Sequence, residues 1–201
     1  LPRTLHDLAY VHEEKGEHEA AEQLYREASR LHRRFYGDAH PRTLRYMGDH
    51  AASLSETGRP GEAERVARRI LRATTEHHGD STWQAGTGHG RFGGLLFRHG
   101  KYAEAAEAFR RMMAHYVADL GPDHLWTAVA EHNLGSALLL AGHAAEGRRH
   151  LERSYPVLER GGRRVTTLLS MDDLEVLVEH LRSRGEDALA SRYQAILDLS
   201  V

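Results

Sequence analysis

Histidine and acidic side chains are the groups in this sequence best suited to chemistry, and it holds 16 histidines and 29 acidic residues. A zinc site on a helix usually begins with two histidines four residues apart, completed by a third ligand. No two histidines have that spacing, and His77 and His78 are adjacent, so on a helix they point in different directions. There is no cysteine to supply a thiolate. The pattern therefore predicts no metal site.

A glycine-rich segment is the second motif with chemical meaning. It runs from Gly86 to Gly94 and contains the G-x-G-x-x-G spacing between Gly88 and Gly93. In dinucleotide-binding proteins this spacing follows a strand and opens a helix within a βαβ unit. Here both flanking segments have helical patterns, and no G-x-S-x-G nucleophile turn occurs. We therefore expect no cofactor, no catalytic residues and no enzyme activity.

Charge and hydrophobicity narrow the class of protein further. The chain has 27 basic and 29 acidic residues, a formal net charge of −2, without the basic excess of nucleic-acid or anionic-membrane binders. No apolar run reaches the roughly 18 residues of a membrane span, and the first residues lack a signal-peptide layout. We expect a cytoplasmic protein with no nucleic-acid or membrane partner. The bias toward Arg, Ala and Gly indicates a bacterial genome rich in G and C.

The elements that position these side chains follow from an internal repeat. Glycines recur every 42 residues at Gly16, Gly58, Gly100 and Gly142, and a second series has the same interval at Gly37, Gly79 and Gly121. Small residues recur in phase with the first series, at Ala9, Ala51, Gly93 and Gly135 and again at Ala21, Ala63, Ala105 and Gly147. Four columns in phase predict a repeat protein.

Each repeat has the pattern of two helices. Residues 17–35 are rich in strong helix formers, and their apolar positions recur at three and four. Residues 4–15 show the same pattern on the other side of Gly16, and glycine suits the turn because it adopts positive φ at little cost. Small residues allow the two helices to approach closely. We therefore expect antiparallel hairpins of a helix A and a helix B, stacked to bury their apolar faces.

The turn glycine, the small columns and the aromatic column of Tyr25 and Phe109 resemble the tetratricopeptide repeat superfamily. The usual unit of that superfamily has about 34 residues. Three features are similar to the kinesin-light-chain-like subclass, which is common in bacterial signalling proteins: the longer unit, the inter-repeat segments 36–44 and 120–127, and the later Asn133-Leu134-Gly135. His40 and His124 belong to these inter-repeat segments, and a structural role is expected for both.

This resemblance implies an all-α fold, a right-handed α-solenoid of antiparallel helix hairpins wound into a superhelix. Four repeats are expected at about 1–36, 37–78, 79–120 and 121–160. Residues 161–201, with helical patterns over 166–184 and 186–199, are expected to form a degenerate fifth repeat that caps the array.

The resemblance also implies that ligands bind on the concave face, which helix A lines in this superfamily. Mapped by register, the candidate binding residues are Tyr10, Arg45, Asp49, Gly90, Arg91, Gly94, His132 and Asn133. The Asn133 amide offers a donor and an acceptor to a ligand backbone. Two alternatives stay open: Asp49 and Arg91 pair with each other, and the glycines form a weak or kinked helix and not a groove floor.

We therefore expect a scaffold that binds a protein or peptide partner. The alternative is a sensor or regulatory segment of a larger bacterial signalling protein, such as a kinase or a switch ATPase; the missing initiator methionine favours such a parent chain.

Overall fold

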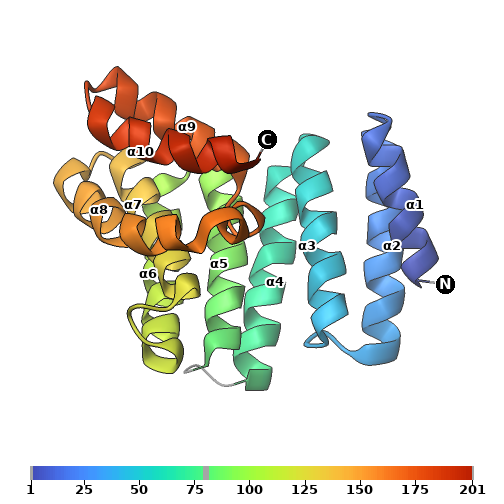
Figure 1. Cartoon of the computed structure of the whole chain (residues 1–201). Helices are drawn as coiled ribbons and strands as arrows, with labels where there is room; N and C mark the ends of the chain where they lie inside the picture. Colours follow the sequence, from blue (N-terminus) through green and yellow to red (C-terminus); the bar gives the residue numbers. More distant parts are fainter. Residues whose placement is uncertain (1, 79–81, 201) are drawn as a thin grey trace. The chain divides into compact units, whose positions relative to one another are not determined.

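The computed structural model describes residues 2–78 and 82–200, and every regular element within them is a helix (Figure 1). Gly79, a member of the second glycine series, lies outside the described residues. The chain divides into two compact units, residues 1–99 and 100–201. The helices of the first unit are α1 (Pro2–Glu14), α2 (His18–Tyr36), α3 (Pro41–Glu56), α4 (Pro60–His78) and α5 (Trp83–Arg98).

The second unit combines α-helices with short 3-10 segments. Its elements are α6 (Tyr102–Leu120), α7 (Leu125–Leu140), α8 (Ala144–Gly161), η1 (Gly162–Thr167), α9 (Met171–Ser183), α10 (Asp187–Leu197) and η2 (Asp198–Ser200). The predicted all-α class, a helical solenoid built from antiparallel hairpins, is confirmed. Among the described helices, none has the length and hydrophobicity needed to cross a bilayer.

Glycines end helix A of each hairpin, as the sequence predicts. Gly16, Gly58, Gly100 and Gly142 have φ angles of +75°, +72°, +70° and +92°. At the first turn, the Gly16 N–H donates to the Glu13 carbonyl and the Glu17 N–H donates to the His12 carbonyl. This pair of bonds is the Schellman arrangement, in which a left-handed residue closes the last turn of a helix. The glycine thereby reverses the chain, so that helix B runs back along helix A.

Histidine begins helix A in two repeats. The Nδ1 atoms of His40 and His124 accept the backbone N–H groups of Arg42 and Trp126, each at 3.2 Å. An acceptor at this position satisfies one of the N–H groups that the first turn of a helix leaves without a partner. The structural role expected for these two histidines is confirmed.

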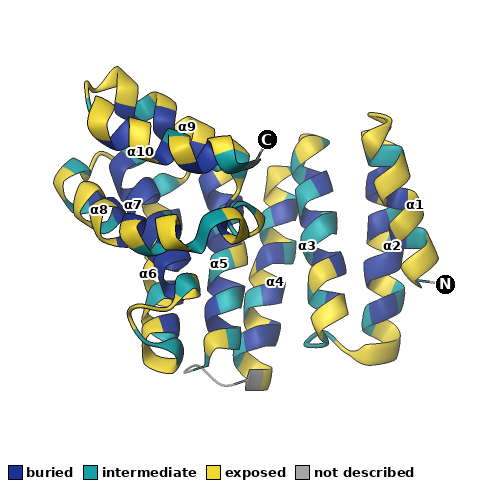
Figure 2. Cartoon of the chain, viewed as in Figure 1, coloured by how far each residue is buried: buried dark blue, intermediate teal, exposed yellow. Residues whose placement is uncertain are grey.

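Small residues allow helix A and helix B to touch through their backbones. Ala21, Ala63 and Ala105 are fully buried, and Figure 2 shows the buried faces turned inward along the helices. A Cβ atom on Gly135 would lie 2.9 Å from the Gly147 carbonyl oxygen, and one on Gly147 would lie 2.7 Å from that of Gly135. Because real Cβ atoms do not approach that closely, α7 and α8 can pack only with glycine at both positions.

The C-terminal hairpin departs from the sequence prediction. A helix was expected from Thr166, but η1 ends at Thr167 and α9 begins only at Met171. The start is set by Ser170, whose Oγ accepts the Asp173 N–H at 3.3 Å. Unlike helix A of the earlier repeats, α9 packs only slightly against the preceding helix B, α8. Instead η1, α9 and α10 share one apolar core with α7 and α8, so this hairpin covers part of α7.

Candidate functional site

In the first unit, side chains from α1, α3 and α5 meet on the helix A face. The His6 Nε2 atom lies 2.6 Å from the Asp49 Oδ2 atom, which joins the first two repeats. The Arg91 Nη1 atom occupies the space above Gly48, where it would lie 2.8 Å from an added Cβ atom. Contacts between neighbouring repeats therefore make this face one connected polar surface, called the A face below.

The Asp49 carboxylate is held by two groups on this surface. His6 is only 7% exposed, and its ring stacks on Tyr46 with centroids 4.3 Å apart. Arg45 lies one turn before Asp49, with its Nε atom 3.8 Å from the carboxylate. Asp49 is thus engaged by His6 and Arg45. Arg45 remains 64% exposed, so most of its guanidinium faces solvent.

The five glycines of α5 divide into two groups. Gly86, Gly88 and Gly93 are buried, and a Cβ atom on Gly88 would lie 2.1 Å from the Thr74 Oγ1 atom of α4. Close packing therefore accounts for the glycine at position 88, and α5 is an uninterrupted helix. Gly90 and Gly94 are instead half-buried, one turn apart. A Cβ atom on Gly94 would meet only Arg98 Nη1, at 3.8 Å, so the space above Gly94 is open.

Acidic side chains collect where α1 and α3 end. The Tyr25 hydroxyl donates to the Glu13 carboxylate at 2.7 Å. Burial and, to a lesser extent, the charge of Glu13 raise the pKa of Glu56. Tyr10 is 54% exposed, one turn before Glu14, whose charge raises the pKa of the Tyr10 hydroxyl. The C-terminal ends of these helices therefore present acceptors, while their N-terminal halves carry exposed arginines.

The last two candidate residues belong to the second unit, and His132 is not available to a ligand. It is 4% exposed, and its ring centroid lies 5.0 Å from that of Tyr193 in α10. Burial lowers the pKa of His132 to about 3, so its ring is neutral. Val129 and Leu139, which the register also turns inward, are each 2% exposed in the core shared with α9 and α10. His132 is therefore a core residue, while Asn133 is half-buried.

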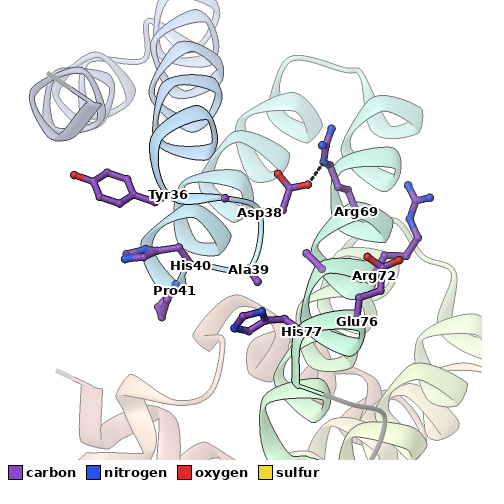
Figure 3. Close-up of a pocket in the computed structure, with 11 residues that line it drawn as sticks. Tyr36, Asp38, Ala39, His40, Pro41, Arg69, Arg72, Glu76 and His77 are labelled. Carbon is purple, nitrogen blue, oxygen red and sulfur yellow. Dashed lines mark hydrogen bonds and ion pairs between the residues drawn. The ribbon is translucent and has the colours of Figure 1, made fainter.

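A pocket of the first unit lies on its helix B side, and the sequence analysis missed it. This junction pocket has a volume of about 840 Å³ and lies between the α2–α3 junction and α4 (Figure 3). It is lined by Tyr36, Gly37, Asp38, Ala39, His40, Pro41, Arg69, Arg72, Ala73, Glu76 and His77. Within it, Arg69 Nε donates to Asp38 Oδ2 at 2.8 Å. In the sequence, the only indication of this pocket is the spacing of Arg69, Arg72 and Glu76, which places the three charged side chains along one face of a helix.

Neither motif raised by the sequence forms a cofactor or metal site. The G-x-G-x-x-G spacing from Gly88 to Gly93 lies inside α5, without the strand and turn that a dinucleotide site requires. Across residues 2–78 and 82–200, no three His, Asp or Glu side chains are grouped so that they could hold a metal ion.

Helix hairpins repeated every 42 residues, with glycine turns and small-residue contacts, define a helical-repeat scaffold. The tetratricopeptide repeat family matches residues 1–76 and 84–160, and the chain belongs to this family. Proteins of this family generally bind other proteins and are generally not enzymes. No curated protein sequence matches the chain.

Solved structures with the same fold include kinesin-light-chain repeats, which confirms the resemblance drawn from the sequence. A variant of the TPR-like repeats of a putative kinesin light chain from Podosopora anserina has a TM-score of 0.69 at 16% identity, covering 98% of this chain and 92% of that one. BtubC (BKLC) from P. vanneervenii has a TM-score of 0.58 at 16% identity, covering 98% and 80%. A Rap protein complexed with Competence and Sporulation Factor has a TM-score of 0.63 at 12% identity, covering 99% and 63%.

Proposed function

We propose that this chain is a scaffold that binds an extended or helical peptide segment of a partner protein on the A face of its first unit. The observation that carries this proposal is the open space above Gly94, where an added Cβ atom would meet only Arg98 Nη1 at 3.8 Å, on a helix where three other glycines are buried. Each glycine in a helix interior costs about 1 kcal/mol relative to alanine. A glycine at an open position such as Gly94 is therefore better explained by a ligand side chain that needs the room, and Gly90, one turn earlier, is proposed to belong to the same space.

Charged and aromatic groups around this space give the ligand its contacts. Arg45 and Arg91 can each donate two hydrogen bonds to a carboxylate or to backbone carbonyls. Asp49 is oriented by His6, and its carboxylate can accept a hydrogen bond from an N–H group of the ligand. Tyr10, more than half exposed, offers an aromatic anchor, a residue type that often dominates binding energy. Asn133 belongs to the second unit and is proposed as a separate ligand contact there.

The comparison with the Rap protein supports the proposal that this chain binds a partner, because the Rap protein was solved in complex with Competence and Sporulation Factor. A helical segment that lays its apolar face into a groove is one general mode of peptide recognition that fits this proposal. If the chain is instead a sensor or regulatory segment of a larger signalling protein, its ligand would use the same face. The same variants therefore test both versions of the proposal.

The first test compares two glycine-to-leucine substitutions. A partner is identified by affinity capture on the chain, and its affinity is then measured for Gly90→Leu and for Gly61→Leu. Gly61 is exposed at the start of α4 and has no atom within 4 Å of an added Cβ, so it is a matched control away from the A face. Gly90→Leu should weaken binding about tenfold or more, since a leucine side chain fills the proposed space. Equal affinities for the two folded variants would refute this use of the A face.

The second test removes charge. Arg91→Ala should weaken the binding of an acidic partner, and the loss should be larger at low salt, where charge pairs are least screened. Arg65→Ala, at a 73% exposed position of α4, removes the same charge from the opposite side of the hairpin. A similar loss for both would show that only the overall charge matters.

A further inference from the structure

The backbone of the junction does not depend on the charged lining of the junction pocket, because the second unit makes the same junction with different residues around it. Gly37 and Gly121 have φ angles of +83° and +87°, and His40 and His124 cap the helices that follow in the same way. Both junctions therefore perform the same structural task with the same two residue types. The side chains that differ between the two junctions are therefore not required for the fold and can have a role in binding.

The lining of the junction pocket differs at three of its four charged positions, and only Arg69 has the same residue type, Arg153, in the second unit. Two repeat lengths later, Pro156 stands in the register of Arg72, and Arg160 stands in that of Glu76. The space is also filled in the second unit, where the Leu125 Cδ1 atom would lie 3.0 Å from a Cβ atom on Gly161. Pro41 replaces that leucine in the first unit, and the space there is open to solvent.

The charges in the pocket are only partly paired. Asp38 is shared between Arg69, at 2.8 Å, and Arg33, at 3.4 Å, so two guanidinium groups face one carboxylate. Within the described part of the chain, the Arg72 and Glu76 side chains have no ion-pair or hydrogen-bond partner. The lining itself is balanced, with Arg69 and Arg72 against Asp38 and Glu76, and the neighbouring Arg33 adds one positive charge beside it. Arg72 and Glu76 offer a donor group and an acceptor group one helical turn apart.

The histidine cap adds a donor. Because His40 Nδ1 accepts the Arg42 N–H, the neutral ring carries its proton on Nε2. Ala39, Pro41 and Ala73 supply an apolar surface between the polar groups, as Figure 3 shows for the labelled residues. A volume of about 840 Å³ is in the range of pockets for ligands much larger than a single small anion.

We propose that the junction pocket is a second binding site, distinct from the A face, for an acidic peptide segment. An aspartate or glutamate side chain of the segment binds the guanidinium groups of Arg72 and Arg69, with Asp38 holding Arg69 in place. A backbone N–H of the same segment donates to Glu76. The segment lies across the apolar surface beneath the α2–α3 junction, so that it touches helix B and the junction but not the face made by helix A.

The test is an NMR titration of the full ¹⁵N-labelled chain with the blocked peptide acetyl-Ala-Glu-Ala-amide. The glutamine analogue and sodium acetate are titrated in parallel. The glutamate peptide should shift the backbone amides of Gly37 to His40 and the side-chain Nε–H signals of Arg69 and Arg72, in a saturable way. The glutamine peptide and acetate should each bind about tenfold more weakly, because one lacks the charge-assisted bond and the other lacks the peptide contacts.

Two arginine variants complete the test. Arg72→Gln should reduce the affinity for the glutamate peptide about tenfold, while Arg65→Gln, which removes the same charge from α4 outside the pocket, should leave it unchanged. Both positions are exposed, so both variants should keep the parent circular dichroism spectrum. The proposal is overturned if the pocket signals do not shift, if acetate binds as well as the peptide, or if the two variants lose affinity equally.

Discussion

The packing of α5 on α4 can be tested by adding one methyl group at each of two glycines. Gly88→Ala should destabilise the protein, whereas Gly94→Ala should stabilise it. Both positions lie inside the same helix, so the gain in helix propensity is the same, about 1 kcal/mol. The difference between the two variants therefore reports only what surrounds each added methyl group.

The magnitude follows from the contacts. At Gly94 the nearest atom would be Arg98 Nη1, at 3.8 Å, so the variant keeps the full gain of about 1 kcal/mol. At Gly88 the methyl carbon would lie 2.1 Å from Thr74 Oγ1. Thr74 is 3% exposed, and its hydroxyl donates to the Leu71 carbonyl at 2.8 Å. Moving it loses that bond and overpacks the contact, for a net loss of about 1–3 kcal/mol.

The measurement is urea denaturation followed by circular dichroism, with the free energy of unfolding compared between variants that have the same denaturant slope. A third variant checks the cause: Thr74→Ala removes the obstructing oxygen, so Gly88→Ala should cost much less in that background. Two results would refute the argument. One is a Gly88→Ala variant as stable as Gly94→Ala, and the other is a cost that Thr74→Ala leaves unchanged.

Two further predictions concern the core of each unit. Ala63→Phe should lower the free energy of unfolding by about 1–3 kcal/mol, because Ala63 is fully buried where helices meet; an unchanged melting temperature would contradict this packing. His132 should make the protein less stable in acid. Burial lowers the pKa of His132 to about 3. Between pH 6.5 and 3 the unfolded chain therefore binds a proton that the folded chain does not. As the pH is lowered through this range, the free energy of unfolding decreases by up to about 1.4 kcal/mol per pH unit. His132→Leu should reduce this slope in urea titrations at pH 7, 6 and 5, and an identical slope in both proteins would show that His132 is not the cause.

Local rules were sufficient to predict the helix hairpins from the sequence. A glycine at positive φ and an alanine at a helix contact are demanded by geometry within a few residues, so Gly16 and Ala21 could be placed by spacing alone. The 42-residue period then fixed the same features in later repeats. Spacing alone does not explain Gly88 of α5, because the contact between Gly88 and Thr74 joins two different repeats.

Features that depend on several elements were not predictable in this way. The register turns His132 toward a ligand, but it cannot show that Tyr193 of the C-terminal hairpin covers it. The start of α9 depends on Ser170, since a side-chain cap can override a helical pattern that extends from Thr166. The junction pocket is formed by a junction and a helix some thirty residues apart in sequence, as Asp38 and Arg69 show, so no single motif contains it.

The repeat itself separates residues that the fold requires from residues that it does not. A column that must be small or buried, such as Ala21, Ala63 and Ala105, has the same property in successive repeats. Arg91 breaks its column, in which the two earlier repeats carry Asp7 and Asp49, and Arg72 stands where a later repeat has proline. Because stacking does not need these charges, removing them should change binding and leave stability nearly constant, whereas changes at Gly88 or Ala63 should lower stability first.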